Sequence, residues 1–512
     1  MQTHGGDPEL LERFGAEVLS KVPHYVEGEG IVNSTPLVDV TSDLAECAGK
    51  EYGSKLGLQG VKIYAKLDSK IFGGSVKVRP AVNILEDAIR TGRLRKGKTV
   101  FEATSGNFGL ALSLLGGLGV QVVALVSRRL QEGVIGQLKQ SGVKLIDLDI
   151  DVCPAPGLEG EADAIMAKAV ASSVRQQLVE LGFDPIQFDG VRSEAEMLLA
   201  RQDAIGLAKV LADAYDGFCT EQYDNELNVE VHRKVTALEL EEQLRELGEA
   251  LREAEVICAF GTGGTATGLS LYSGEVHGRK MVRVVFPKSG QDVAGIRTRE
   301  KAAGLAFYRP ESYLGEHEVD FEATRPLFRF FNARGYDVGE SGALALYVAM
   351  QMVNFGKRGT LVALVADGAS KYSQAMAKPR RDQVNLDVAR AEASEYGRVL
   401  WTHTMVVPSE AGVAIIAKSL GVDEDKVVVA KTGDVLSLVN GRQASEEFMA
   451  LLPRDGKRTL LVCMAGNTSL FTAKALAKQG VLAESLNGGI GGLPEARTVP
   501  MASLVKMAGL GS

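Results

Sequence analysis

The chain has 512 residues, of which 45% are hydrophobic and 24% charged, a composition typical of globular proteins. At roughly 100–200 residues per domain, this length predicts about three structural units. The net charge is −8 and no basic cluster is present, which argues against a nucleic acid or an anionic membrane as a partner.

The N-terminal 22 residues are interrupted by charged side chains such as Asp7 and Glu12, so no secretory signal is predicted. No apolar run reaches the roughly 18 residues that a membrane helix needs, and we expect a cytoplasmic protein. The five cysteines are far apart and the six histidines are scattered. This spacing predicts neither a disulfide framework nor a metal site.

Short β-rich runs alternate with longer helical stretches between residues 62 and 366. Most positions in these runs are apolar, as in strands buried on both faces. A helix near residues 240–251 repeats leucine at the spacing of one helical face. The alternation predicts an α/β fold with a largely parallel sheet and right-handed crossovers. We expect strands at residues 99–102, 121–126, 144–148, 256–260, 281–286 and 360–365.

Two interruptions divide the chain. Residues 151–192 open with Cys-Pro-Ala-Pro-Gly at 153–157, which suits neither a helix nor a central strand, and we interpret them as a surface insertion. Charged residues also crowd around Pro379. We therefore expect a first region over residues 1–385 and a separate, smaller α/β unit over residues 395–512.

The first segment that could carry chemistry is Gly-Gly-Ser-Val-Lys-Val-Arg at residues 73–79. Its glycines permit close approach of the backbone to a ligand, and Ser75 is predicted to cap the helix that follows. Lys77 then lies in the first helical turn, where the helix dipole disfavours a cation. Its amine is therefore suited to forming a Schiff base. The alternative is an ordinary solvent-exposed lysine.

Three further segments follow strands or precede helices. Ala-Thr-Ser-Gly-Asn-Phe-Gly at 103–109 opens a helix after a strand, a position that suits a carboxylate ligand. The N–H groups and hydroxyls of Gly-Thr-Gly-Gly-Thr-Ala-Thr-Gly at 261–268 suit a phosphate monoester. Ser341, before a small-residue helix, could present its hydroxyl to a ring nitrogen. A capped turn, a glycine-rich turn and a serine cap are the respective alternatives.

Taken in this order, the four segments resemble the fold type II enzymes that use pyridoxal 5′-phosphate (PLP). The closest resemblance is to the cysteine synthase group, the O-acetylserine and O-phosphoserine sulfhydrylases. The similarity extends from about residue 33 to residue 376 and opens with Asn-Ser-Thr-Pro-Leu at 33–37. It implies two lobes of parallel-rich sheets flanked by helices, PLP as the cofactor, and a homodimer.

The resemblance also implies a role for each matching residue. Lys77 forms the Schiff base with the cofactor, Asn107 binds the ring hydroxyl, and Ser341 meets the pyridine nitrogen. The residues implied to hold the 5′-phosphate are Gly261, Thr262, Gly263, Gly264 and Thr265. Those implied to contact the substrate carboxylate are Thr104, Ser105, Asn107 and Gln222.

A neutral serine at the ring nitrogen favours β-elimination through an aminoacrylate over transamination. We therefore expect β-replacement on a serine-derived amino acid, with sulfide or a carried sulfur as the nucleophile. A β-eliminating desulfhydrase or dehydratase is one alternative. A catalytically silent regulatory scaffold is another, because Val78, Pro80 and Phe108 depart from the family pattern.

Residues 459–469 read as a strand, a loop and a helix, which places Cys463 where loop N–H groups and the helix dipole stabilise a thiolate. This loop and Asn-Gly-Gly-Ile-Gly-Gly-Leu-Pro at 487–494 resemble the second half of a rhodanese-like domain. The resemblance implies a persulfide on Cys463, with a sulfur donor or sulfur-carrier protein as a partner. The alternative is a buried cysteine at the end of a strand.

Overall fold

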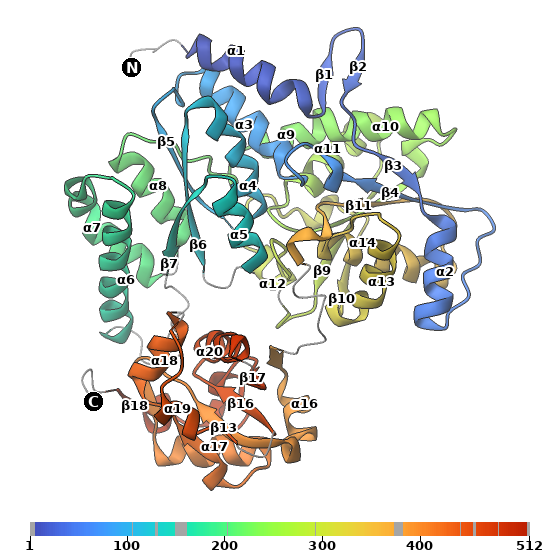
Figure 1. Ribbon diagram of the computed structural model, residues 1–512. Helices are drawn as coiled ribbons and strands as arrows, with labels where there is room; N and C mark the ends of the chain where they lie inside the picture. The colour runs from blue at the N-terminus through green and yellow to red at the C-terminus, as the bar shows by residue number, and fades with distance from the viewer. Residues whose placement is uncertain are drawn as a thin grey trace. The chain divides into compact units, whose positions relative to one another are not determined.

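The computed structural model forms two compact units (Figure 1). Unit 1 comprises residues 1–126, 130–146 and 204–378, and unit 2 comprises residues 127–129, 147–203 and 379–512. The start of the expected insertion, with Cys153, lies outside the described residues. In the part of the chain that the structure describes, no helix combines the length and apolar character needed to span a bilayer. The described residues are 6–104, 106–127, 132–148, 161–201, 203–291, 293–372, 382–440, 442–453, 457–479 and 481–508.

The larger sheet of unit 1 has six strands in the order β10-β9-β8-β11-β4-β3, parallel except for the antiparallel edge strand β3. One face packs on helices α2, α13 and α14, and the other packs on α10 and α11. The strands are β3 (Leu37–Asp39), β4 (Val61–Leu67), β8 (Glu255–Ala259), β9 (Val282–Pro287), β10 (Gly315–Val319) and β11 (Gly359–Val365). The helices are α2 (Thr41–Tyr52), α10 (Ala237–Glu246), α11 (Gly264–His277), α13 (Phe321–Ala333) and α14 (Glu340–Asn354).

The smaller sheet of unit 1 has the order β5-β6-β7 and shares a core with four helices. The six predicted strands all form, each within one residue of its expected ends, because buried apolar runs carry a strong local signal. The expected helix near 240–251 is shorter than predicted: α10 ends at Glu246, so Leu247, which is 48% exposed, and the buried Leu251 lie beyond it. The elements are β5 (Thr99–Ala103), β6 (Gln121–Ser127), β7 (Lys144–Leu148), α1 (Pro8–Glu17), α3 (Val78–Arg90), α4 (Asn107–Leu112) and α5 (Glu132–Gln140).

Unit 2 contains a parallel five-stranded sheet with the order β12-β17-β16-β13-β15. Helix α17 (Glu410–Leu420) packs on one face and α18 (Thr432–Val439) and α20 (Asn467–Lys478) on the other. The same unit holds two helices that pack against each other, α6 (Glu161–Glu180) and α7 (Pro185–Ala200). The strands are β12 (Gln383–Val384), β13 (Tyr396–Trp401), β15 (Val427–Val429), β16 (Arg458–Val462) and β17 (Ala483–Leu486).

Candidate active site

Lys77 lies immediately before helix α3, at the end of a glycine-containing loop. Gly73 and Gly74 adopt positive φ angles of 94° and 76°. A Cβ on Gly73 would come within 2.7 Å of the Val78 side chain, so both conformation and space require glycine there. This loop fixes the direction in which the lysine leaves the backbone.

Ser75 does not cap helix α3. It forms an isolated β-bridge with Asp367, and the N–H of Val76 donates to the carbonyl of Ala366 at 2.7 Å. These contacts fix Ser75 and Val76 against the segment after β11, and a turn over Val76 and Lys77 leads into the helix, which begins at Val78 with Lys77 in the N-cap position. The prediction of a Ser75 cap is therefore wrong, because a tertiary contact with the end of β11 displaces the local capping motif.

Packing explains two of the three departures from the family pattern, and position in the helix explains the third. Val78 is fully buried in the core of the smaller sheet, and Phe108 is 3% exposed in the same core. Pro80 is the third residue of α3, where a backbone N–H has no intrahelical acceptor, so its missing donor costs no hydrogen bond. None of the three side chains gives a reason to expect a silent site.

The Lys77 amine lies next to the glycine-rich loop. Its Nζ donates to Thr262 Oγ1 at 3.4 Å. Burial and, to a smaller extent, the nearby Arg297 guanidinium lower the pKa of this amine to about 8. A lysine with such a pKa is substantially neutral near pH 8, the state in which it is a nucleophile. Sequence reasoning gave no signal for Arg297, which only the fold brings near Lys77.

Arg297→Met should therefore raise the pKa of Lys77, because a neighbouring positive charge no longer opposes protonation. In cofactor-free protein, the rate of covalent PLP capture should rise with pH through a midpoint near the lysine pKa, and this midpoint should move to higher pH in the variant. Stopped-flow absorbance across the pH range measures the shift. Arg299→Met, a matched change two residues away, should leave the midpoint unchanged; an equal shift in both variants would contradict the assignment.

The loop between β8 and α11 forms a cradle bounded by bare backbone. A Cβ on Gly261 would lie 2.8 Å from the carbonyl oxygen of Gly295 and 3.6 Å from Lys77 Nζ. One on Gly264 would come within 2.1 Å of Asn228 Oδ1. The loop opens a helix of 14 residues, whose first N–H groups attract an anion. The closely packed backbone and the helix N-terminus fit the phosphate of PLP, and the adjacent Lys77 amine fits its reactive end.

A hydrogen-bonded chain of two threonine hydroxyls and a histidine begins at this loop. Thr265 Oγ1 lies 3.1 Å from His232 Nε2, and His232 Nδ1 lies 3.0 Å from Thr236 Oγ1. Burial lowers the pKa of His232 to about 3, so its ring is neutral near pH 7. His232 thus orients the Thr265 hydroxyl without adding charge to the phosphate cradle.

Asn107 is held by groups at the end of β11. Its Nδ2 donates to Asp367 Oδ2 at 2.7 Å, and its Oδ1 accepts from Lys371 Nζ. Tyr372 donates its hydroxyl to the same Asp367 oxygen at 2.6 Å, while Asp367 Oδ1 is buried without a hydrogen-bond partner among the described residues. Burial lowers the pKa of Lys371. The Asn107 amide is therefore fixed in one orientation at the first residue of α4.

The residue that precedes the helix of Ser341 contacts Asp367, which also binds Asn107. Ser341 is the second residue of α14 and is 5% exposed. The preceding Gly339 donates its N–H to the Asp367 carbonyl at 2.8 Å, and a Cβ on Gly339 would come within 1.9 Å of Asp367 Oδ1. Asp367 lies within the span that resembles the family, but sequence reasoning gave it no role. In the structure Asp367 contacts Asn107 directly and Gly339, the N-cap residue of the helix that contains Ser341.

Thr104 uses its hydroxyl locally. Its Oγ1 accepts the N–H groups of Gly106 and Gly109, both at 3.1 Å, and so caps helix α4. Ser105, expected beside it, lies outside the described residues. The described part of this loop is thus held by its own hydrogen bonds.

Gln222 is buried and tied to the glycine-rich loop. Its side-chain Nε2 donates to Glu102 Oε1 at 3.3 Å, and its main-chain carbonyl accepts from Asn228 Nδ2 at 2.7 Å. Asn228 Nδ2 also donates to Thr262 Oγ1 at 3.1 Å. The structure therefore joins Lys77, Thr262 and Gln222 in one hydrogen-bonded group. Sequence reasoning missed Glu102, although a charged residue within an apolar strand was a signal.

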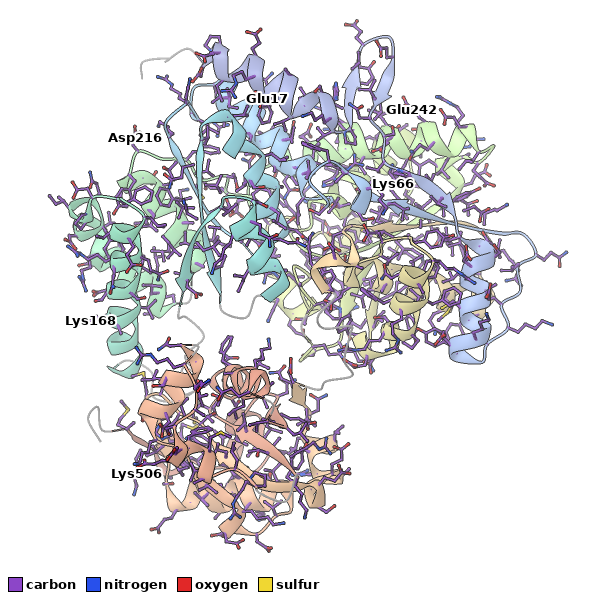
Figure 2. The ribbon with its side chains drawn as sticks, viewed as in Figure 1. Glu17, Lys66, Lys168, Asp216, Glu242 and Lys506 are labelled. Carbon is purple, nitrogen blue, oxygen red and sulfur yellow. The ribbon has the colours of Figure 1, made fainter. Side chains whose placement is uncertain are left out.

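A buried network of two cations and two anions includes Lys66, which is labelled in Figure 2. Lys66 Nζ lies 2.6 Å from Glu239 Oε1, and Arg79 lies 2.7 Å from Glu239 Oε2 and 2.8 Å from Asp68 Oδ1. Thr35, from the Asn-Ser-Thr-Pro-Leu segment, donates its N–H to Glu239 at 2.6 Å. Because Arg79 is in the first turn of α3, the network anchors the helix that follows Lys77.

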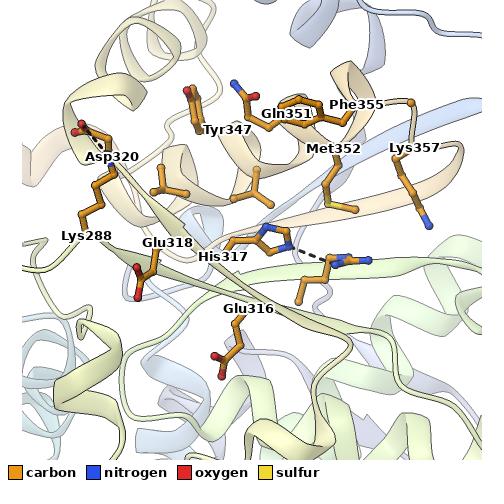
Figure 3. A pocket seen from close by; sticks show the side chains of 14 residues that line it. Lys288, Glu316, His317, Glu318, Asp320, Tyr347, Gln351, Met352, Phe355 and Lys357 are labelled. Carbon is orange, nitrogen blue, oxygen red and sulfur yellow. Dashed lines mark hydrogen bonds and ion pairs between the residues drawn. The ribbon is translucent and has the colours of Figure 1, made fainter.

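A separate pocket of about 780 Å³ lies at the edge strand β10 (Figure 3). None of the predicted site residues lines it. Its charged side chains pair locally: Lys288 Nζ lies 3.6 Å from Asp320 Oδ2, and Arg283 lies 3.4 Å from His317 Nε2. The described residues contain no group of three or more side chains suited to holding a metal ion.

In unit 2, Cys463 follows strand β16 directly and is 2% exposed. Its Sγ accepts the N–H groups of Gly466 at 3.2 Å and Ser469 at 3.4 Å, and lies 3.2 Å from Ser469 Oγ. Helix α20 begins at Asn467. The loop thus directs several hydrogen-bond donors at this sulfur.

Comparison with known proteins covers the larger part of the chain. The family model described as "Pyridoxal-phosphate dependent enzyme" matches residues 50–367. Cysteine synthase of Aquifex aeolicus (strain VF5) is 26% identical over 356 residues, 67% of this chain and 89% of that protein. Cystathionine beta-synthase of Saccharomyces cerevisiae is 28% identical over 245 residues, 47% of this chain and 38% of that protein. A crystal structure of O-ureido-L-serine synthase covers 66% of this chain and 90% of its own, with 22% identity and a TM-score of 0.47.

Proposed function

The chain belongs to the family of pyridoxal-phosphate dependent enzymes, and on this premise we propose that it catalyses β-replacement on a serine-derived amino acid, as a cysteine synthase does. The observation that carries the proposal is the juxtaposition of the Lys77 amine and the Gly261–Thr265 loop, 3.4 Å apart at Thr262. The similarity to cysteine synthases over 67% of the chain supports the choice of reaction.

Each residue of the site has its own role in the proposed reaction. When bound, PLP supplies an electron sink that labilises the α-proton and the β-substituent of an amino acid. The Gly261–Thr265 loop and the start of α11 bind its phosphate, and Asn107 and Ser341 contact the ring. Lys77 Nζ holds the cofactor and takes up the substrate α-proton as general base. Gln222 and the Thr104–Asn107 loop bind the substrate carboxylate. The neutral Ser341 favours loss of the β-substituent.

Product analysis distinguishes this reaction from the two alternatives. The PLP-loaded protein is incubated with O-acetyl-L-serine or O-phospho-L-serine, with and without sulfide. Cysteine formed only with sulfide, without a matching release of pyruvate, is the expected result. Pyruvate as the main product under both conditions would replace β-replacement by β-elimination. A protein that binds no PLP would be a scaffold instead.

We further propose that the sheet-containing part of unit 2 is a rhodanese-like domain that carries sulfur on Cys463. The strand order β12-β17-β16-β13-β15 and the N–H groups directed at Cys463 Sγ support this proposal. Tethering would present carried sulfur to the first unit at a high effective concentration. The partner implied is a sulfur donor or sulfur-carrier protein, and the assembly implied by the cysteine synthase resemblance is a homodimer.

A sulfur donor tests the second proposal separately. Thiosulfate should transfer its outer sulfur to the Cys463 thiolate and release sulfite, adding the mass of one sulfur atom to the protein. Cys463→Ser should abolish the mass gain, while Cys258→Ser, at another buried cysteine, should not. A mass gain that persists in Cys463→Ser would contradict the proposal without bearing on the PLP site.

A further inference from the structure

Glu102 is a buried carboxylate that the proposed chemistry does not use. It lies near the end of β5, directly before the Thr104–Asn107 loop, and is 3% exposed. Its Oε2 accepts both the N–H of Thr220, at 3.2 Å, and the Thr220 hydroxyl. Its Oε1 accepts Gln222 Nε2 at 3.3 Å. Among the described residues no cation forms an ion pair with it.

Burying a carboxylate without a cationic partner costs desolvation free energy. Desolvation raises the pKa of Glu102 to about 7, and the nearby negative charge of Glu221 acts in the same direction, opposed by the hydrogen bonds from Thr220 and Gln222. An unpaired carboxyl at the end of a core strand is destabilising whenever it ionises. Retaining it therefore calls for a role that an apolar side chain could not fill.

The backbone next to Gln222 is also held in an unfavourable form. Glu221 has a φ of 53°, in the left-handed region that side chains other than glycine rarely adopt. Its carbonyl accepts the N–H groups of Asp224 and Asn225, both at 2.9 Å. This turn directs Gln222 inward, where Asn228 ties its carbonyl to Thr262. The main chain of Gln222 is thus fixed, and its amide remains the part to be oriented.

We propose that Glu102 is a positioning residue: by accepting an N–H of the Gln222 amide, it fixes that side chain so that N–H rather than C=O is presented to the substrate α-carboxylate. A glutamine amide has nearly the same shape in its two flipped orientations, and only an acceptor such as a carboxylate selects the one with nitrogen facing it. In the flipped form the amide oxygen would face the substrate carboxylate and repel it. The inference rests on the proposed function, in which Gln222 contacts that carboxylate.

Steady-state kinetics of the PLP-loaded enzyme test the inference. Glu102→Ala should raise the KM for the amino-acid substrate about tenfold, the equivalent of one lost hydrogen bond. Its kcat should stay within about twofold of wild type and its bound-PLP absorbance should be unchanged. The isosteric Glu102→Gln, which retains an acceptor for Gln222, should restore most of the affinity. A purely structural role would lower thermal stability without this selective change in KM.

A double-mutant cycle makes the test specific. Gln222→Ala should raise KM by itself, and adding Glu102→Ala to it should raise KM no further. Thr220→Val, which removes the hydroxyl holding the other carboxylate oxygen, provides a second variant: it should raise KM about threefold in the wild-type background and not in Gln222→Ala. Independent, multiplying effects in either cycle would overturn the inference. An unchanged KM in Gln222→Ala would also overturn it, yet leave β-replacement itself intact, since that reaction is measured on the wild-type enzyme.

Discussion

Lys77→Ala is expected to lower kcat/KM for β-replacement by about three orders of magnitude or more, because the substitution removes both the covalent attachment of PLP and the proposed general base. The phosphate cradle and the Asn107 network are left in place, so the variant should still bind PLP, but without a covalent bond. Borohydride reduction followed by peptide mapping measures this directly. In wild type the cofactor should be recovered on the peptide that contains Lys77, and in Lys77→Ala on no peptide.

Lys371 provides the matched control for this assignment. It is also a buried lysine with a lowered pKa, and it contacts Asn107, so it is the competing amine in the same region. Lys371→Ala should retain covalent PLP, since the amine that faces the glycine-rich loop is unchanged. Recovery of the cofactor on the Lys371 peptide of wild type would show that the amine had been wrongly assigned.

Local signals predicted the strands and the segments proposed to bind ligands. The strands are runs of apolar residues, and burial on both faces of a sheet enforces such runs whatever their neighbours are. The glycine-rich loop was found because bare backbone at a helix N-terminus is a property of consecutive residues. The α/β fold and the PLP cofactor expected from these segments are confirmed by the family match over residues 50–367. The role of each site residue remains a prediction.

Features created by distant contacts could not be predicted in the same way. Ser75 has the residue type of a helix cap, but a bridge to Asp367, nearly 300 positions along the chain, decides its conformation. The environment of Lys77 depends on Arg297, whose segment has no motif. Leu247 continues a helical repeat in the sequence after the helix has ended. In each case the sequence gives the residue type, and the tertiary neighbour determines what it does.

Glu239→Ala is expected to destabilise unit 1 by about 3–5 kcal/mol, because it leaves Lys66 and Arg79 buried with only one anion, Asp68, between them. The same change removes the acceptor for the N–H of Thr35. The double variant Lys66→Met/Glu239→Ala removes one charge of each sign and should recover much of the loss, since replacing a buried pair by apolar groups is often nearly neutral. Glu246→Ala, on the exposed side of the same helix, should change stability by less than about 0.5 kcal/mol.

The chain provides an internal reference for this measurement. Its single tryptophan, Trp401, is buried in the core of unit 2, so tryptophan fluorescence follows the unfolding of that unit. Loss of bound PLP absorbance follows unit 1, whose α3 begins with the turn that Arg79 anchors. In Glu239→Ala the denaturant midpoint for PLP release should fall while the Trp401 transition stays in place. A Glu239→Ala midpoint equal to that of Glu246→Ala would mean that water or rearranged side chains compensate the two cations. The first turn of α3, and with it the approach of Lys77 to the phosphate cradle, would then have to be held by packing rather than by charge.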